Sequence, residues 1–133
     1  MAGNNSFPRV QYAFFCENII QATGKTTYEG VLDKIIVDCP KVIKLYFVLR
    51  LWDIAAGEHK VTINWHTIPS TEPYTCNFNF TAEQRAISAT LIPQAIDLAI
   101  NKADRYVFTI LWDDIEDRNL TSFSLPVCIL PGQ

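Results

Sequence analysis

The stretch from Val42 to Trp52 constrains the fold more than any other part of the chain. Its odd-numbered positions are all large and apolar, whereas its even-numbered positions mix apolar, aromatic and basic side chains. Successive side chains of a strand point to opposite faces of a sheet, so this two-residue period predicts a long strand with one face in the core. The stretch is too short for a membrane-spanning helix, which needs about 20 residues. We interpret it as the central strand of a β-sandwich.

Composition and charge narrow the class of protein. The chain has 133 residues, of which 49% are hydrophobic and 19% charged, so it is expected to fold as one domain over residues 9–130 behind a flexible tail at 1–8. The net charge of −3, with no basic run, argues against nucleic acid and membrane surfaces as partners. The polar N-terminus has neither the basic start nor the apolar core of a signal peptide, which predicts a cytoplasmic location.

Alternation recurs along the rest of the chain and predicts an all-β, antiparallel β-sandwich, immunoglobulin-like or similar, with about eight strands. The second of these strands is expected over residues 27–37, with an irregularity near Gly30. Thr81 and Gln84 match a helix capping box, which predicts a short helical turn near residues 82–85, followed by two short strands. One short helix near residues 82–91 is the alternative. The predicted core consists of Tyr12, Phe14, Leu45, Phe47, Leu49, Ile63, Trp65, Phe78, Phe108 and Ile110.

The cysteines and histidines give no recognisable catalytic or metal-binding spacing. The four cysteines, Cys16, Cys39, Cys76 and Cys128, contain no Cys-x-x-Cys pair, and free thiols are favoured over two disulfides. His59 and His66 are seven residues apart on one predicted strand, so they face opposite sides and cannot share a metal ion. A nucleophilic pair of a histidine with Cys16 or Cys76 would have to be assembled by the fold.

An acidic turn follows the strand that ends at Trp112. It contains Asp113, Asp114, Glu116 and Asp117 and is followed by Asn119, and calcium prefers several carboxylates on one loop. The turn lacks the glycine and the final glutamate of an EF-hand loop, so a solvated hairpin turn is favoured over a calcium site. We therefore predict neither a metal nor a cofactor.

The second face of the long strand is the candidate site. Tyr46, Val48 and Trp52 lie there beside Lys44 and Arg50. Exposed aromatic rings favour partner interfaces or sugar binding, because they bury large areas at low entropic cost. The alternative is that this face is covered, so that the strand is buried on both sides.

Four segments resemble one known family. They are Ala13-Phe14-Phe15-Cys16-Glu17, Gly24-Lys25, Gly30-Val31-Leu32-Asp33-Lys34-Ile35 and Tyr106-Val107-Phe108. In these segments the chain is similar to an uncharacterised family of small bacterial proteins, known as a domain of unknown function. The resemblance implies a compact all-β sandwich and supplies no activity, cofactor or catalytic residue.

Two function hypotheses follow. The preferred one is a non-enzymatic binding or assembly module that contacts a protein partner, or a second copy as a homodimer, through Tyr46, Val48 and Trp52. The alternative is a small hydrolase or metal-dependent enzyme that uses the acidic turn at 113–119 or an assembled Cys–His pair. The chain contains no phosphate-binding loop and no Gly-x-Ser-x-Gly motif to support a specific reaction.

Overall fold

The computed structural model describes residues 7–68, 73–84, 86–91, 95–100, 105–115 and 118–129. The described residues form strands and no helix, and none of them belongs to a helix that could cross a membrane. The strands are β1 (Arg9–Cys16), β2 (Asn18–Ala22), β3 (Lys25–Glu29), β4 (Ile35–Val37), β5 (Lys41–Ile54), β6 (Gly57–Ile68), β7 (Tyr74–Ala82), β8 (Ala86–Leu91), β9 (Ile96–Ile100), β10 (Arg105–Trp112) and β11 (Asn119–Ile129). The all-β prediction is therefore confirmed.

Strand β5 organises the first sheet, as its alternation predicts. It pairs antiparallel with β1 on one side, and on the other side with β8 along its C-terminal half and β9 along its N-terminal half. Its odd-numbered side chains point into the core, where Leu45, Phe47, Leu49 and Leu51 are at most 2% exposed. Burying large apolar side chains on one face is the main force that holds such a sheet against its neighbour.

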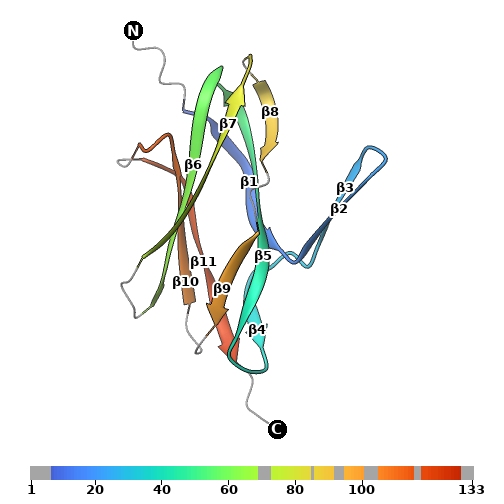
Figure 1. Ribbon diagram of the computed structural model, residues 1–133, viewed down its shortest axis with the longest axis vertical. Helices are drawn as coiled ribbons and strands as arrows, with labels where there is room; N and C mark the ends of the chain where they lie inside the picture. The colour runs from blue at the N-terminus through green and yellow to red at the C-terminus, as the bar shows by residue number, and fades with distance from the viewer. Residues whose placement is uncertain are drawn as a thin grey trace.

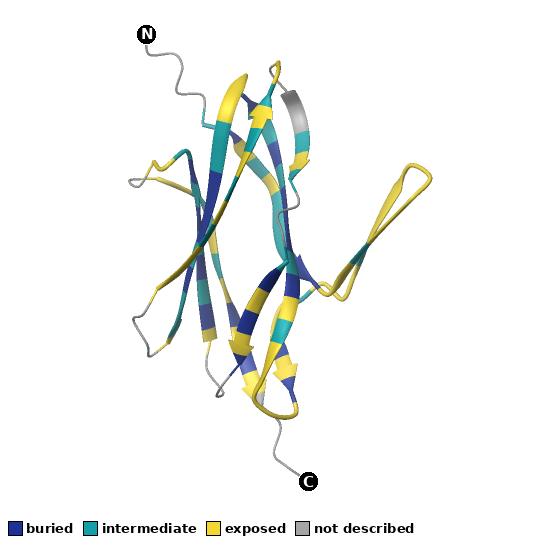
Figure 2. Ribbon diagram, in the orientation of Figure 1, coloured by how far each residue is buried: buried dark blue, intermediate teal, exposed yellow. Residues whose placement is uncertain are grey.

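The second sheet has the order β4-β11-β10-β6-β7 and is antiparallel except for the parallel pair of β4 and β11. It faces the first sheet (Figure 1), and strands of both sheets carry buried residues (Figure 2). Aromatic rings fill the centre of this core. Phe15 packs against Phe108, with ring centroids 4.7 Å apart, and Phe123 lies 5.4 Å from Phe108. Phe47 contacts both Phe15 and Phe123.

Strands β2 and β3 form a separate hairpin that extends away from the two larger sheets (Figure 1). A two-residue turn joins them, in which Thr23 and Gly24 both have positive φ values of 39° and 77°. Two positive φ values match the right-handed twist of the flanking strands, as is typical of a tight hairpin turn. Most of the hairpin is exposed, apart from Ile19 and Tyr28 near its base.

The orientation predicted for the first strand is wrong. Phe15 is buried in the core and Ala13 packs against it, whereas Tyr12 and Phe14 are half-buried on the opposite face. Both faces of this strand carry aromatic residues, so alternation alone does not distinguish them. A register shift between Val10 and Tyr12 also changes the pairing with β5. Elsewhere in the predicted core, Phe78 is only partly buried.

Three further expectations are corrected. The described residues form eleven strands, more than the eight or so predicted. The strand predicted over 27–37 is split, because Gly30 has a φ of +67° and the chain passes from the β2–β3 hairpin to β4 in the other sheet. Residues 86–91 form β8, paired with β5, so the helical alternative fails there. Tertiary pairing overrides the local helix signal at Thr81 and Gln84.

Candidate functional site

The candidate site lies on the face of the first sheet that points away from the core. Cross-strand pairing places Tyr12 opposite Arg50, Phe14 opposite Val48 and Cys16 opposite Tyr46. The aromatic side chains of β1 therefore lie next to the even-numbered side chains of β5. Sequence alternation alone missed this layer, because it assigned Tyr12 and Phe14 to the core.

Tyr28 from the β2–β3 hairpin packs on this layer. Its ring meets Phe14 edge-on, with centroids 5.1 Å apart, and its hydroxyl donates a hydrogen bond to Tyr12. Burial acts to raise the pKa of Tyr12, but hydrogen bonds from Arg50, Tyr28 and Thr90 outweigh burial and lower it. Burial and the neighbouring Tyr12 raise the pKa of Tyr28. These contacts hold the base of the hairpin against the first sheet.

The predicted stripe of Tyr46, Val48 and Trp52 is not continuously exposed. Val48 is 0% exposed, so it belongs to the packing of this layer and cannot contact a partner directly. Tyr46 and Trp52 are half-buried. The physical reason is that β1 and the hairpin contribute their own aromatic side chains to this face, so the expectation of a covered face holds for Val48.

Exposure increases toward the start of β5. Val42, on the same face as Tyr46, is 65% exposed, and Ile36 of β4 and Val31 just before it are 51% and 56% exposed. We call Val31, Ile36 and Val42 the β4–β5 patch. Soluble proteins usually cover such clusters of exposed aliphatic side chains with a partner.

A small cavity lies beside the β4–β5 patch. It has a volume of about 150 Å³ and is lined by apolar residues of β4 and β5, including Ile36 and Ile43, with Glu17 and Lys44 as its charged lining residues. Strand β1 pairs with β5 only from Tyr46 onward, so the edge of β5 on this side has no partner strand among the described residues at 41–45. This arrangement fits the binding of an apolar side chain, with opposite charges nearby.

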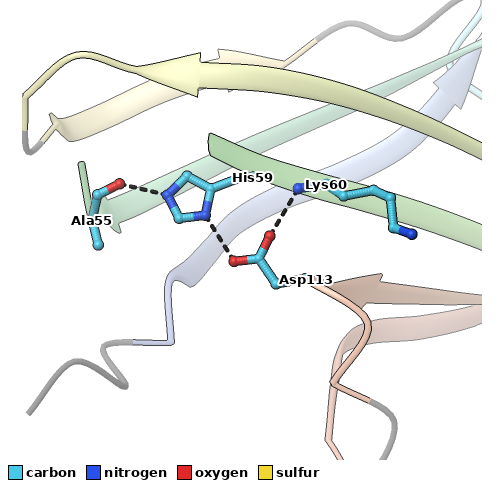
Figure 3. A network of polar contacts seen from close by, with 4 residues as sticks. All are labelled: Ala55, His59, Lys60 and Asp113. Atoms are coloured by element: carbon cyan, nitrogen blue, oxygen red, sulfur yellow. Dashed lines mark hydrogen bonds and ion pairs between the residues drawn. The ribbon is translucent and has the colours of Figure 1, made fainter. Parts of the chain in front are cut away.

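A polar network joins β6 to the turn after β10 (Figure 3). Asp113 accepts a hydrogen bond from the backbone N–H of Lys60 at 2.8 Å, and its other carboxylate oxygen lies 2.8 Å from Nδ1 of His59. Nε2 of His59 contacts the carbonyl oxygen of Ala55, and the ring stacks on Trp112 with centroids 4.5 Å apart. Both ring nitrogens are therefore engaged by the protein itself, which favours a structural role for this histidine.

The acidic turn is also engaged by the protein. Besides the contacts of Asp113, Asp114 forms an ion pair with Lys60 at 2.7 Å, while Glu116 and Asp117 lie outside the described residues. Within the described part of the chain, no group of three or more His, Cys, Asp or Glu side chains could hold a metal ion. Sequence reasoning missed the pairing of His59 with Asp113, because the two residues are 54 positions apart.

All four cysteines are free thiols, so the alternative of two disulfides is wrong. Cys16 is buried, Cys76 is half-buried, and Cys39 and Cys128 are exposed. Cys76 of β7 pairs across the sheet with Ile63 of β6. His59 is also on β6, four residues before Ile63. Strands rise about 3.3 Å per residue, so this separation is too long for a nucleophile–base hydrogen bond.

We predict that alkylation separates these thiols. Iodoacetamide should modify Cys39 and Cys128 in the folded protein and leave Cys16 unmodified, because burial raises the pKa of the Cys16 thiol and excludes the reagent. Peptide mass spectrometry before and after unfolding in urea measures this. Rapid labelling of Cys16 under native conditions would contradict its burial beside Tyr46.

Comparison of the chain with protein-family models gave no match, and comparison with curated proteins gave none either. The class that the structure itself defines is an all-β protein with two facing sheets and an additional hairpin. The function is therefore argued from the site.

Proposed function

We propose that this protein is a non-enzymatic binding or assembly module that contacts a protein partner through the outer face of its first sheet. In this proposal Tyr46 and Trp52 contribute their exposed parts, and the contact extends to the β4–β5 patch. The observation that carries the proposal is the high exposure of Ile36, which lines a small cavity, and of Val31 and Val42, which are next in the chain to the lining residues Leu32 and Ile43. Large apolar groups that remain in water at one place favour burial by a partner.

The partner that fits this surface presents an apolar side chain to the cavity. A volume of about 150 Å³ suits one aliphatic or aromatic side chain rather than a cofactor, since ligand pockets usually exceed about 300 Å³. A basic group of the partner near Glu17 and an acidic group of the partner near Lys44 would complement the charges that line the cavity. Such pairs orient a partner and accelerate its association.

The architecture in this proposal is a β-sandwich whose layers are the two larger sheets. A rigid two-layer scaffold suits a binding module, because it holds surface side chains in place without needing a catalytic centre. The resemblance to the uncharacterised bacterial family is consistent with this architecture and adds no activity. His59 and Asp113 are engaged by contacts within the protein, so they lend no support to the alternative that the protein is an enzyme.

The proposal predicts that two aliphatic substitutions weaken partner binding. Ile36→Ser and Val42→Ser, made together, should lower the recovery of the co-purifying partner from extracts of the source cells at least about tenfold, the loss expected for removing a central apolar contact of about 1.4 kcal/mol. Quantitative mass spectrometry after affinity purification measures this. Both side chains are more than half exposed, so the substitutions should leave stability within about 0.5 kcal/mol.

The matched control is Ile68→Ser, which removes an aliphatic side chain that is 45% exposed at the end of β6. It should leave partner recovery unchanged. Equal recovery with the double variant and the wild type would show that the β4–β5 patch is not the contact. Loss with Ile68→Ser as well would indicate a nonspecific apolar effect.

A further inference from the structure

Strand β7 forms one edge of the second sheet (Figure 1). It pairs with β6 through nine consecutive residues, from Tyr74 opposite Trp65 to Ala82 opposite Gly57, with no shift in register. On its other side it has no partner strand in the described part of the chain. A regular, unpaired edge presents a row of backbone N–H and C=O groups that can hydrogen-bond to another strand.

The other edges of the two larger sheets carry features that hinder pairing. Strand β1 follows Pro8, begins with the charged Arg9 and has a register shift after Val10. Strand β4 has only three residues and covers β11 only at residues 127–129, and the rest of β11 ends in Pro126. The edge opposite β1 is divided between the short strands β8 and β9. Proteins commonly protect edges by shortening, bulges, proline and charge.

Apart from Pro73 just before its first residue, strand β7 has none of these features. Its nine residues, Tyr-Thr-Cys-Asn-Phe-Asn-Phe-Thr-Ala, include no charged side chain, no proline and no glycine. It is the longest edge strand among the described residues. A sheet edge of this kind is open to the addition of a further strand.

The core is also open beside this edge. A cavity of about 320 Å³ lies between the C-terminal end of β7 and the first sheet, and its apolar lining includes Ile54, Phe80, Ala82, Ala89 and Leu91. Phe80 and Ala82 belong to β7 itself. A strand added to this edge would therefore also bring side chains over an apolar opening. Two independent features thus point to a partner at the same place.

We propose that β7 pairs with the β7 strand of a second copy of this chain, antiparallel and around a two-fold axis at Phe78. In this register Phe78 meets its own equivalent, Asn77 lies opposite Asn79, and Thr75 lies opposite Thr81. All nine residues of each strand then have a partner. The two second sheets join into one continuous sheet, and the interface is the same surface on both copies, as in most symmetric dimers.

The pattern of β7 is complementary to itself in this register. Its exposed outer face consists of Thr75, Asn77, Asn79 and Thr81, so every outer pair joins two uncharged side chains that can hydrogen-bond. Its inner face carries the apolar and aromatic residues. No like charges meet anywhere along the strand, because none of its nine side chains is charged. Glu83, which also lines the cavity, lies just beyond the end of the strand.

The aromatic residue at the start of β7 fits the opening at its end. Tyr74 is 52% exposed, although it lies on the inner face and stacks on Trp65 with centroids 6.0 Å apart. In the proposed register Tyr74 of one copy lies opposite Ala82 of the other, at the border of the 320 Å³ cavity. Each copy therefore supplies one exposed ring and receives one. Because this contact uses the second sheet, it is independent of the partner surface proposed on the first.

The experiment is sedimentation velocity of the full chain at about 1 and about 100 μM, a range that brackets the Kd of a moderate dimer, about 10 μM. At the higher concentration the wild type should sediment with twice the 15.1 kDa chain mass. Asn77→Lys/Asn79→Lys places lysines directly opposite each other across the two-fold axis, and like charges in this position are unfavourable. This double variant should sediment as a monomer at both concentrations.

The matched control is Ser122→Lys/Ser124→Lys on β11. These serines are exposed on the same sheet, but β10 and β6 lie between their strand and β7, so lysines there do not meet across the proposed two-fold axis. The control should remain a dimer. In the wild type, amide hydrogen exchange along β7 should be about fourfold slower at the higher concentration than at the lower, which is the fall in the monomer fraction for such a dimer. This measurement needs no variant, so misfolding of the lysine variants cannot obscure the result.

A wild type that stays monomeric at about 100 μM, with exchange along β7 independent of concentration, would overturn the proposal and leave this edge to a strand from a different protein. A dimer that persists in Asn77→Lys/Asn79→Lys would also overturn it. If that dimer were instead lost in Trp52→Ala, self-association would belong to the outer face of β5. Loss of the dimer only in the β7 variant supports the proposal.

Discussion

Phe47→Ala is expected to lower the free energy of unfolding by about 3–5 kcal/mol, the usual loss for a fully buried aromatic residue. Phe47 is 0% exposed, and its ring lies 5.2 Å from that of Phe15 and 6.3 Å from that of Phe123. Because these rings come from both larger sheets, the substitution removes contacts that join the sheets as well as apolar surface. Such a loss is a large fraction of the stability of an ordinary domain.

Urea denaturation followed by circular dichroism measures this effect. The midpoint should fall while the slope with denaturant stays the same, which identifies a change in stability rather than in compactness. Val42→Ala on the same strand is the control, since its side chain is 65% exposed and should change stability by less than about 0.5 kcal/mol. Similar losses for the two variants would mean that the orientation of β5 is wrong.

The orientation of β5 could be predicted because only one of its faces is uniformly large and apolar. The same reasoning failed for β1, where Tyr12 and Phe14 on one face compete with Ala13 and Phe15 on the other. The choice depends on what covers each face, and Tyr28 of the β2–β3 hairpin covers Tyr12 and Phe14. That contact arises from the fold of the hairpin, so no local pattern contains it.

Prediction of the candidate site from the sequence is limited in the same way. The even-numbered face of β5 was identified correctly as the face away from the core, but the burial of Val48 follows from its cross-strand neighbour Phe14. The exposed β4–β5 patch depends on the chain entering the second sheet at β4 before it returns to β5. The free edge of β7 is a property of strand order. Local alternation does not determine strand order, because the pairing partners are far apart in sequence.

The second large effect is expected at Asp113, whose carboxylate joins β6 to the turn after β10. Asp113→Ala should lower the free energy of unfolding by about 2–4 kcal/mol, because it leaves the half-buried ring of His59 and the N–H of Lys60 without their acceptor. Asp113 also has a φ of 52°, a left-handed conformation that alanine adopts less readily than aspartate or asparagine. The loss therefore combines missing hydrogen bonds with backbone strain.

Two further variants separate these contributions in the same denaturation experiment. Asp113→Asn keeps a residue that tolerates the left-handed conformation and an oxygen acceptor, so it should lose about half as much as Asp113→Ala. Asp114→Asn is the matched control: it has a φ of 60° and an ion pair with Lys60, but its side chain is 63% exposed. Exposed ion pairs contribute little, so the control should change stability by less than about 0.5 kcal/mol. If Asp114→Asn cost as much as Asp113→Asn, general loss of negative charge in the turn would explain the effect. The contact with His59 would then contribute no stability of its own.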